Sequence, residues 1–91
     1  MPTVNINKLR NKTVLTVETD DYVYVLNVVV PADGVVYVET GDKAIGNEIL
    51  YRVWDIIQGS PLEFHGRGDV RQTSGVNHVT VSGDGWSYEA F

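Results

Sequence analysis

The sequence predicts a mainly β fold, a single small antiparallel sheet or sandwich domain over residues 1–91 with at most one short helix near 47–58. Two observations support this prediction. Segments rich in β-branched and aromatic residues alternate with turn residues over 13–40, which is the pattern of a meander. A second alternating pattern surrounds Asp84-Gly85 within 77–91 and is typical of a hairpin. If 47–58 is helical, the class becomes α+β.

The size and the absence of cysteine set the means of stabilisation. Ninety-one residues are enough for one domain, and a second would leave too little apolar surface for each core. The chain has no cysteine, so a disulfide framework and a thiolate metal site are both excluded. We therefore expect stability to come from tight packing or from partner chains.

The first twelve residues differ in charge from the rest of the chain. They contain Lys8, Arg10 and Lys12 and no acidic residue, whereas the remaining residues hold four basic and twelve acidic side chains, a balance of −8. In an extended segment, residues two apart project from the same face. Residues 1–12 are therefore interpreted as a basic arm or edge strand. The three side chains either lie in solvent at a strand edge or dock on an acidic surface, such as that of a neighbouring copy.

The meander has three predicted strands, at 13–19, 22–30 and 35–39. A two-residue turn at Asp20-Asp21 and a four-residue turn at 31–34 fix the register. This register places Val17 opposite Tyr24, Val30 opposite Val35 and Val28 opposite Tyr37. The face predicted to form the core carries Leu15, Val17, Tyr22, Tyr24, Leu26, Val28, Val30, Val35 and Tyr37.

The opposite face of the predicted meander is also apolar. A face open to water normally alternates to polar residues, so we expect this one to be covered by a second copy of the chain. The predicted self-association face consists of Val23, Val25, Val29, Val36 and Val38.

Residues 47–58 fit two secondary structures. As a helix, the segment would be capped by Asn47 and would end before Gly59. As a strand, the run from Ile49 to Ile57 has a strong β preference. We expect a helix, with a strand as the alternative.

The C-terminal hairpin allows a register test. A two-residue loop at Asp84-Gly85 pairs Val81 with Tyr88 and Val79 with Ala90, and it separates apolar from polar residues completely. We expect the apolar face to be core, with Trp86 and Tyr88 buried beside the valines.

The sequence contains no motif for catalysis or metal binding. His65 and His78 are thirteen residues apart, and no serine lies in a nucleophile motif. We expect no catalytic residue, no metal, no cofactor and no enzymatic activity. The tripeptide Arg67-Gly68-Asp69 occurs in integrin-binding adhesive proteins, but here it is interpreted as a chance match in a glycine-bounded loop.

Charge and hydropathy limit the classes of partner that the chain is expected to bind. The net charge of −5 disfavours nucleic acid, and no apolar run has the length of a signal peptide or a membrane span. We expect a soluble protein, cytoplasmic or virion-associated, that binds protein and forms homo-oligomers. The predicted function is a non-enzymatic interaction module, a self-associating structural or attachment component such as a phage virion accessory protein. The alternative is a small acidic inhibitor, a nucleic-acid mimic that blocks a basic site on a partner.

Overall fold

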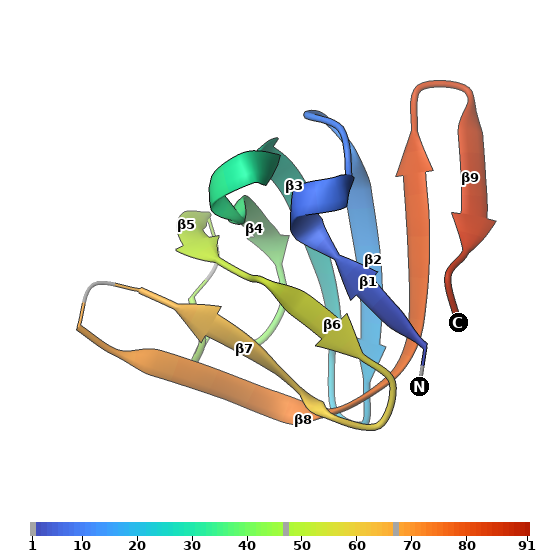
Figure 1. Ribbon diagram of the computed structural model, residues 1–91. Coiled ribbons are helices and arrows are strands. Elements are labelled where there is room, and N and C mark those ends of the chain that lie inside the picture. Colours follow the sequence, from blue (N-terminus) through green and yellow to red (C-terminus); the bar gives the residue numbers. More distant parts are fainter. Residues whose placement is uncertain (1, 47, 67) are drawn as a thin grey trace.

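The computed structural model describes residues 2–46, 48–66 and 68–91, and these form antiparallel strands with no α-helix (Figure 1). The strands are β1 (Thr3–Asn5), β2 (Val14–Thr19), β3 (Val23–Val30), β4 (Val35–Thr40), β5 (Ile49–Arg52), β6 (Asp55–Ile57), β7 (Pro61–His65), β8 (Val70–Gly83) and β9 (Trp86–Glu89). Two 3-10 segments, η1 (Ile6–Lys8) and η2 (Pro31–Asp33), join them. The predicted mainly β class is confirmed.

The larger sheet closes on itself through the long strand β8. Its strand order is β2-β3-β4-β5-β7-β8-β9, and β2 also pairs with β8. The first part of β8, from Val70 to Gly75, pairs with β7, and the part from Val76 to Ser82 pairs with β2. Figure 1 shows the bend in β8 between these two parts. Strand β9 pairs with β8 and lies outside the closed ring.

A two-stranded sheet of β1 and β6 lies across the ring. Val4 pairs with Ile56, and both side chains are buried, as is Ile6 in the following η1. In Figure 1 this pair passes in front of the larger sheet. The small sheet therefore helps to enclose the core.

Every second side chain along the strands of the ring points into the core, because side chains alternate between the two faces of a β-strand. At its centre Phe64 lies between Tyr24 and Tyr51, with ring centroids 5.7 and 5.3 Å away. Burial of Tyr24 raises the pKa of its hydroxyl, and the nearby Asp42 carboxylate raises it further. The buried hydrophobic residues are Val4, Ile6, Leu15, Val17, Tyr24, Leu26, Val28, Val36, Val38, Ile45, Tyr51, Val53, Ile56, Leu62, Phe64, Val76, Val79 and Val81.

The first turn of the meander has the predicted register, and the second does not. Strands β2 and β3 pair Val17 with Tyr24, as expected. Strands β3 and β4 pair Val30 with Val35 as expected, but Val28 pairs with Val36, not with Tyr37. The cause is a register shift between Val28 and Val30, where one extra residue is inserted into β3 as in a β-bulge.

The bulge exchanges the two faces of β4. Val36 and Val38, predicted for the self-association face, are fully buried in the core. Val23 and Val29 of that face are exposed and Val25 is partly exposed, so the predicted five-valine face does not exist as one surface. The expected core positions change as well: Tyr22 and Val30 are exposed, whereas Val35 and Tyr37 are only partly buried.

The helix expected within 47–58 is wrong, and the strand alternative holds for its described residues. Strand β5 pairs with β4, β6 pairs with β1, and Val53 between them donates its N–H to the Gly34 carbonyl at 2.8 Å. Tyr51 and Val53 are buried and Trp54 is exposed, which is an alternating pattern. The expected cap, Asn47, lies outside the described residues.

The C-terminal hairpin has the predicted register but not the predicted burial. Val81 pairs with Tyr88, and Ala90 donates its N–H to the Val79 carbonyl at 2.8 Å. However, Trp86 is 45 % exposed and Tyr88 is 53 % exposed. Their burial was a wrong prediction because β9 lies beyond the β2–β8 closure, where the core no longer covers its inner face.

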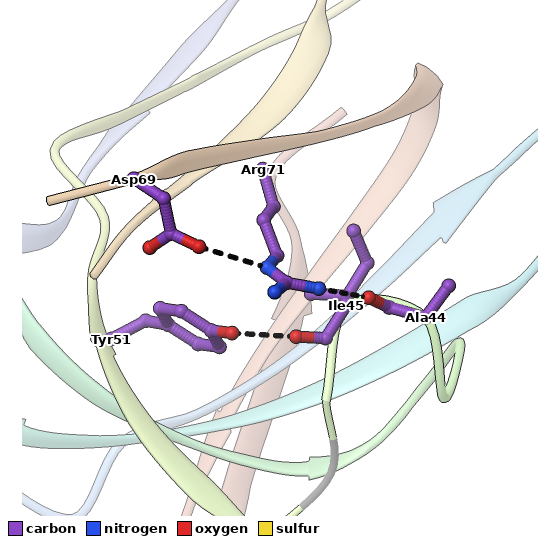
Figure 2. A network of polar contacts seen from close by, with 5 residues as sticks. All are labelled: Ala44, Ile45, Tyr51, Asp69 and Arg71. Carbon is purple, nitrogen blue, oxygen red and sulfur yellow. Dashed lines mark hydrogen bonds and ion pairs between the residues drawn. The ribbon is translucent and has the colours of Figure 1, made fainter. Parts of the chain in front are cut away.

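Hydrogen bonds connect the loop between β4 and β5 with strands β5 and β8 of the larger sheet (Figure 2). Tyr51 donates its hydroxyl to the Ile45 carbonyl at 2.5 Å. Arg71 donates to the Ala44 carbonyl and, through Nε, to the Asp69 carboxylate at 3.2 Å. Asp69 of the Arg-Gly-Asp tripeptide is thus engaged within the fold, and Arg67 lies outside the described residues.

Tyr51→Phe is expected to lower the free energy of unfolding by about 1–3 kcal/mol, because the Ile45 carbonyl loses the donor of its buried hydrogen bond. Urea unfolding followed by circular dichroism measures this loss. Tyr37→Phe is the matched control, since Tyr37 is only partly buried, and it should change the free energy by about 0.5 kcal/mol or less. Equal effects of the two substitutions would contradict a stabilising role for the Tyr51 hydroxyl.

Among the described residues, no helix has the length and apolar character needed to cross a membrane.

Candidate functional site

The basic N-terminal segment is folded against the sheet, not extended. Leu9 donates its N–H to the Ile6 carbonyl at 3.0 Å, which closes η1 at Lys8. Lys12 donates its N–H to the Val28 carbonyl at 2.9 Å and has a positive φ of 71°. Lys8, Arg10 and Lys12 are all exposed, but the turn separates Lys12 from the other two. The extended conformation that would align the three cations is therefore not present, and their docking on an acidic surface stays a prediction.

Two of the three cations lie beside the aromatic residues of β9. Lys8 and Arg10 line one hollow of about 250 Å³ together with Leu9, Thr13, Trp86 and Tyr88. The rings of Trp86 and Tyr88 stack, with centroids 6.0 Å apart and planes 17° from parallel. We call Lys8, Arg10, Trp86 and Tyr88 the basic–aromatic surface.

The position of the Trp86 ring depends on a glycine across the hairpin. Gly83 pairs with Trp86, and a Cβ atom at Gly83 would lie 2.5 Å from the ring atoms Cε2 and Cζ2. The ring therefore lies directly against the backbone of β8, where any other residue would displace it. Contact with Gly83 on one side and with Tyr88 on the other fixes the indole while leaving it accessible to a partner.

The hollow continues on the other side of Tyr88. A second hollow of about 470 Å³ shares Lys8, Leu9 and Tyr88 with the first and is otherwise lined by residues of β1 and the C-terminal end. Tyr88 thus lies between two depressions that follow the junction of the N-terminal segment with β9. The surface combines concave shape, aromatic rings and positive charge.

An acidic and apolar surface lies at the opposite end of β2. Strand β2 ends at Thr19, and Asp20 and Asp21 form the turn that follows. Thr19 holds this turn through its hydroxyl, which donates to the Tyr22 carbonyl at 2.8 Å. Both aspartates are exposed, as are the Tyr22 and Val23 side chains. We call Asp20, Asp21, Tyr22 and Val23 the acidic hairpin end.

The two surfaces are far apart on one molecule. The six residues of β2 separate the segment after Lys12 from the turn at Asp20, and a strand of that length spans roughly 20 Å. One chain therefore presents a basic and an acidic surface at opposite ends of the same strand. They cannot neutralise each other within the molecule.

Sequence reasoning found the cations of the site and missed its aromatic half. The charge balance of residues 1–12 indicates Lys8 and Arg10, whereas the hairpin pattern predicts that Trp86 and Tyr88 are buried in the core. Among the described residues, no group of three or more histidine, aspartate or glutamate side chains is arranged to hold a metal ion.

Comparisons with protein-family models, with curated proteins and with solved structures found no match.

Proposed function

We propose that this chain is a non-enzymatic protein-interaction module that self-associates, with the basic–aromatic surface of one copy against the acidic hairpin end of another. The observation that supports this most directly is the shared hollow of Lys8, Arg10, Trp86 and Tyr88 on a chain whose other residues carry a net negative charge. A second copy supplies further negative charge to these cations, beyond that of Glu89 at the adjoining hollow.

The chemistry of the two surfaces is complementary. Lysine and arginine pair with aspartate, and the arginine guanidinium can bind a carboxylate through two parallel hydrogen bonds. Tyrosine, tryptophan and arginine are the residues that most often dominate binding energy at protein interfaces. On the acidic side, Tyr22 and Val23 offer apolar area to the stacked rings. The interface would therefore combine charge pairing with the removal of aromatic surface from water.

Contact between two different surfaces has a consequence for symmetry. A head-to-tail interface leaves one basic and one acidic surface free on every pair, so growth continues into a ring or a filament. Such repetitive assembly suits a structural or attachment component, of which a phage virion accessory protein is one example. Burial of Val36 and Val38 removes the valine face as the means of association.

Charge reversal at either end is expected to abolish association, and mixing the two variants is expected to restore it. Lys8→Glu with Arg10→Glu makes both surfaces acidic, and Asp20→Lys with Asp21→Lys makes both basic. Each variant alone repels itself and should sediment as a monomer. In an equimolar mixture every contact again joins opposite charges. Sedimentation velocity of both variants and of the mixture measures this, and added salt should weaken association of the wild type.

The control matches the change in net charge. Lys43→Glu with Arg52→Glu also replaces two exposed cations but lies outside both surfaces, and it should associate like the wild type. A wild type that sediments as a monomer at tens of micromolar would overturn the proposal. That result would favour the acidic-inhibitor alternative, which needs a basic partner in place of a second copy.

A further inference from the structure

A separate hollow of about 420 Å³ lies on the outer side of β6 and β7. Because side chains alternate along a strand, Ile56, Leu62 and Phe64 point into the core while their neighbours face outward. The hollow is lined by Trp54, Asp55, Ile57, Ser60, Pro61, Glu63 and His65. Its volume falls within the range of small-molecule sites in proteins, and it shares no residue with the basic–aromatic surface.

Trp54 forms a fixed aromatic wall of this hollow. Its carbonyl accepts the Ile6 N–H at 3.0 Å, and the preceding Val53 N–H is bonded to Gly34, so the backbone is held from two sides. The indole packs on Gly34, where a Cβ atom would lie 2.9 Å from the ring atom Cε3. Even so, the Trp54 side chain is 47 % exposed. A large aromatic ring is thus held rigidly and remains open to solvent.

The charged groups of the hollow are acidic. Asp55 and Glu63 both line it, and none of the described residues that line it is a lysine or an arginine. Glu63 is held in place by Gln72, whose side-chain amide donates to Oε2 at 2.7 Å, and by His65, whose Nε2 lies 3.5 Å from Oε1. The carboxylates add to the field of a chain with a net charge of −5. The hollow therefore attracts cations and repels anions.

We propose that this hollow binds an organic ammonium ion, with the cation against the Trp54 ring and its charge balanced by Asp55 and Glu63. Tryptophan is the most favourable aromatic partner for a cation, and quaternary ammonium groups are recognised by such rings. Ile57 and Pro61 supply apolar contacts for the alkyl groups of the ion. The inference does not depend on self-association, because the two surfaces differ in residues and in charge.

The experiment compares choline with its neutral isostere, 3,3-dimethylbutan-1-ol, by nuclear magnetic resonance of the full-length protein. The chain has two tryptophans and hence two indole N–H signals, which Trp86→Phe assigns. Choline should shift the Trp54 signal and leave the Trp86 signal in place. Its affinity should exceed that of the isostere by about tenfold or more, since only choline carries the charge.

Variants separate the ring from the carboxylates. Trp54→Leu should abolish the binding of choline, as followed by the backbone amide signals of β6 and β7, and Trp86→Leu should leave it unchanged. Asp55→Asn with Glu63→Gln should weaken choline binding roughly tenfold without changing that of the isostere. All of these side chains are exposed, and well-dispersed amide spectra verify that the variants are folded.

Three results would overturn the inference. One is the absence of any shift of the Trp54 signal at saturating choline concentrations that shift a free indole. The second is equal binding of choline and the neutral isostere, which would show a merely apolar hollow. The third is binding of methyl glucoside in preference to choline, which would show a carbohydrate site with Trp54 as its stacking platform.

Discussion

Val36→Glu is expected to unfold the domain, with a loss of about 4 kcal/mol or more in the free energy of unfolding. Val36 is fully buried in the core opposite Tyr51 on β5, and a carboxylate there would have no partner and no water. A small domain has only about 5–15 kcal/mol of stability in total. Circular dichroism of the purified variant, with and without urea, measures the loss.

The control for this substitution is Val23→Glu. Val23 belongs to the same predicted valine face but is about half exposed, so a glutamate there should cost about 0.5 kcal/mol or less. A folded Val36→Glu variant would show that the bulge in β3 is misplaced. That result would support the register predicted from the sequence, in which Val36 and Val38 face outward and form a surface for a second copy.

The register of β3 and β4 shows why the sequence predicts the strands better than their faces. Before the Asp20-Asp21 turn, Leu15 and Val17 of β2 alternate with the polar Thr16 and Glu18, so the two-residue turn leaves only one register that buries the apolar side chains of β2. Around the next turn, residues 28–30 are all valine and residues 35–38 are all apolar. A slip of one residue there exchanges one apolar side chain for another, and the pattern cannot reveal the bulge.

The C-terminal hairpin illustrates a different limit. Its register depends on Asp84-Gly85 and on residues a few positions away, and the prediction of Val81 opposite Tyr88 is confirmed. The exposure of Trp86 depends on the pairing of β8 with β2, which joins Val14 to Ser82. The two residues are far apart in the sequence, so no pattern within the hairpin itself indicates this pairing. The helix expected for 49–57 is wrong for a related reason, because the partners of this segment lie outside it: β5 pairs with the preceding β4, and β6 pairs with the distant β1.

The candidate site contains residues that the sequence indicates and residues that only the fold brings together. Charge is a property of composition, so Lys8 and Arg10 could be identified from the sequence alone. Their proximity to Trp86 and Tyr88 comes from the fold, which brings the two ends of the chain to one hollow. The hollow at Trp54 could not be predicted either, because Trp54 lies between strands β5 and β6 in a segment for which a helix was expected.

Phe64→Ala is expected to lower the free energy of unfolding by about 3–5 kcal/mol, the range for a buried aromatic residue truncated to alanine. Phe64 is fully buried and packs between Tyr24 and Tyr51, so its removal leaves a cavity bounded by two large rings that strands on both sides hold in place. If the alanine variant does not fold, Phe64→Leu should fold with a smaller loss, because it retains most of the apolar contact.

The comparison for Phe64→Ala is Trp86→Ala, which removes a larger side chain. Because the indole is 45 % exposed and lies against Tyr88 and the backbone at Gly83, outside the core, its removal should cost about 1 kcal/mol. Urea unfolding of the two variants, followed by circular dichroism, measures both values under the same conditions. A larger loss for Trp86→Ala than for Phe64→Ala would place the indole in the core and remove the basic–aromatic surface as a docking site. If Trp86→Ala lowers the free energy of unfolding as little as expected, the variant stays folded. Any effect of that substitution on association then reports on the interface itself.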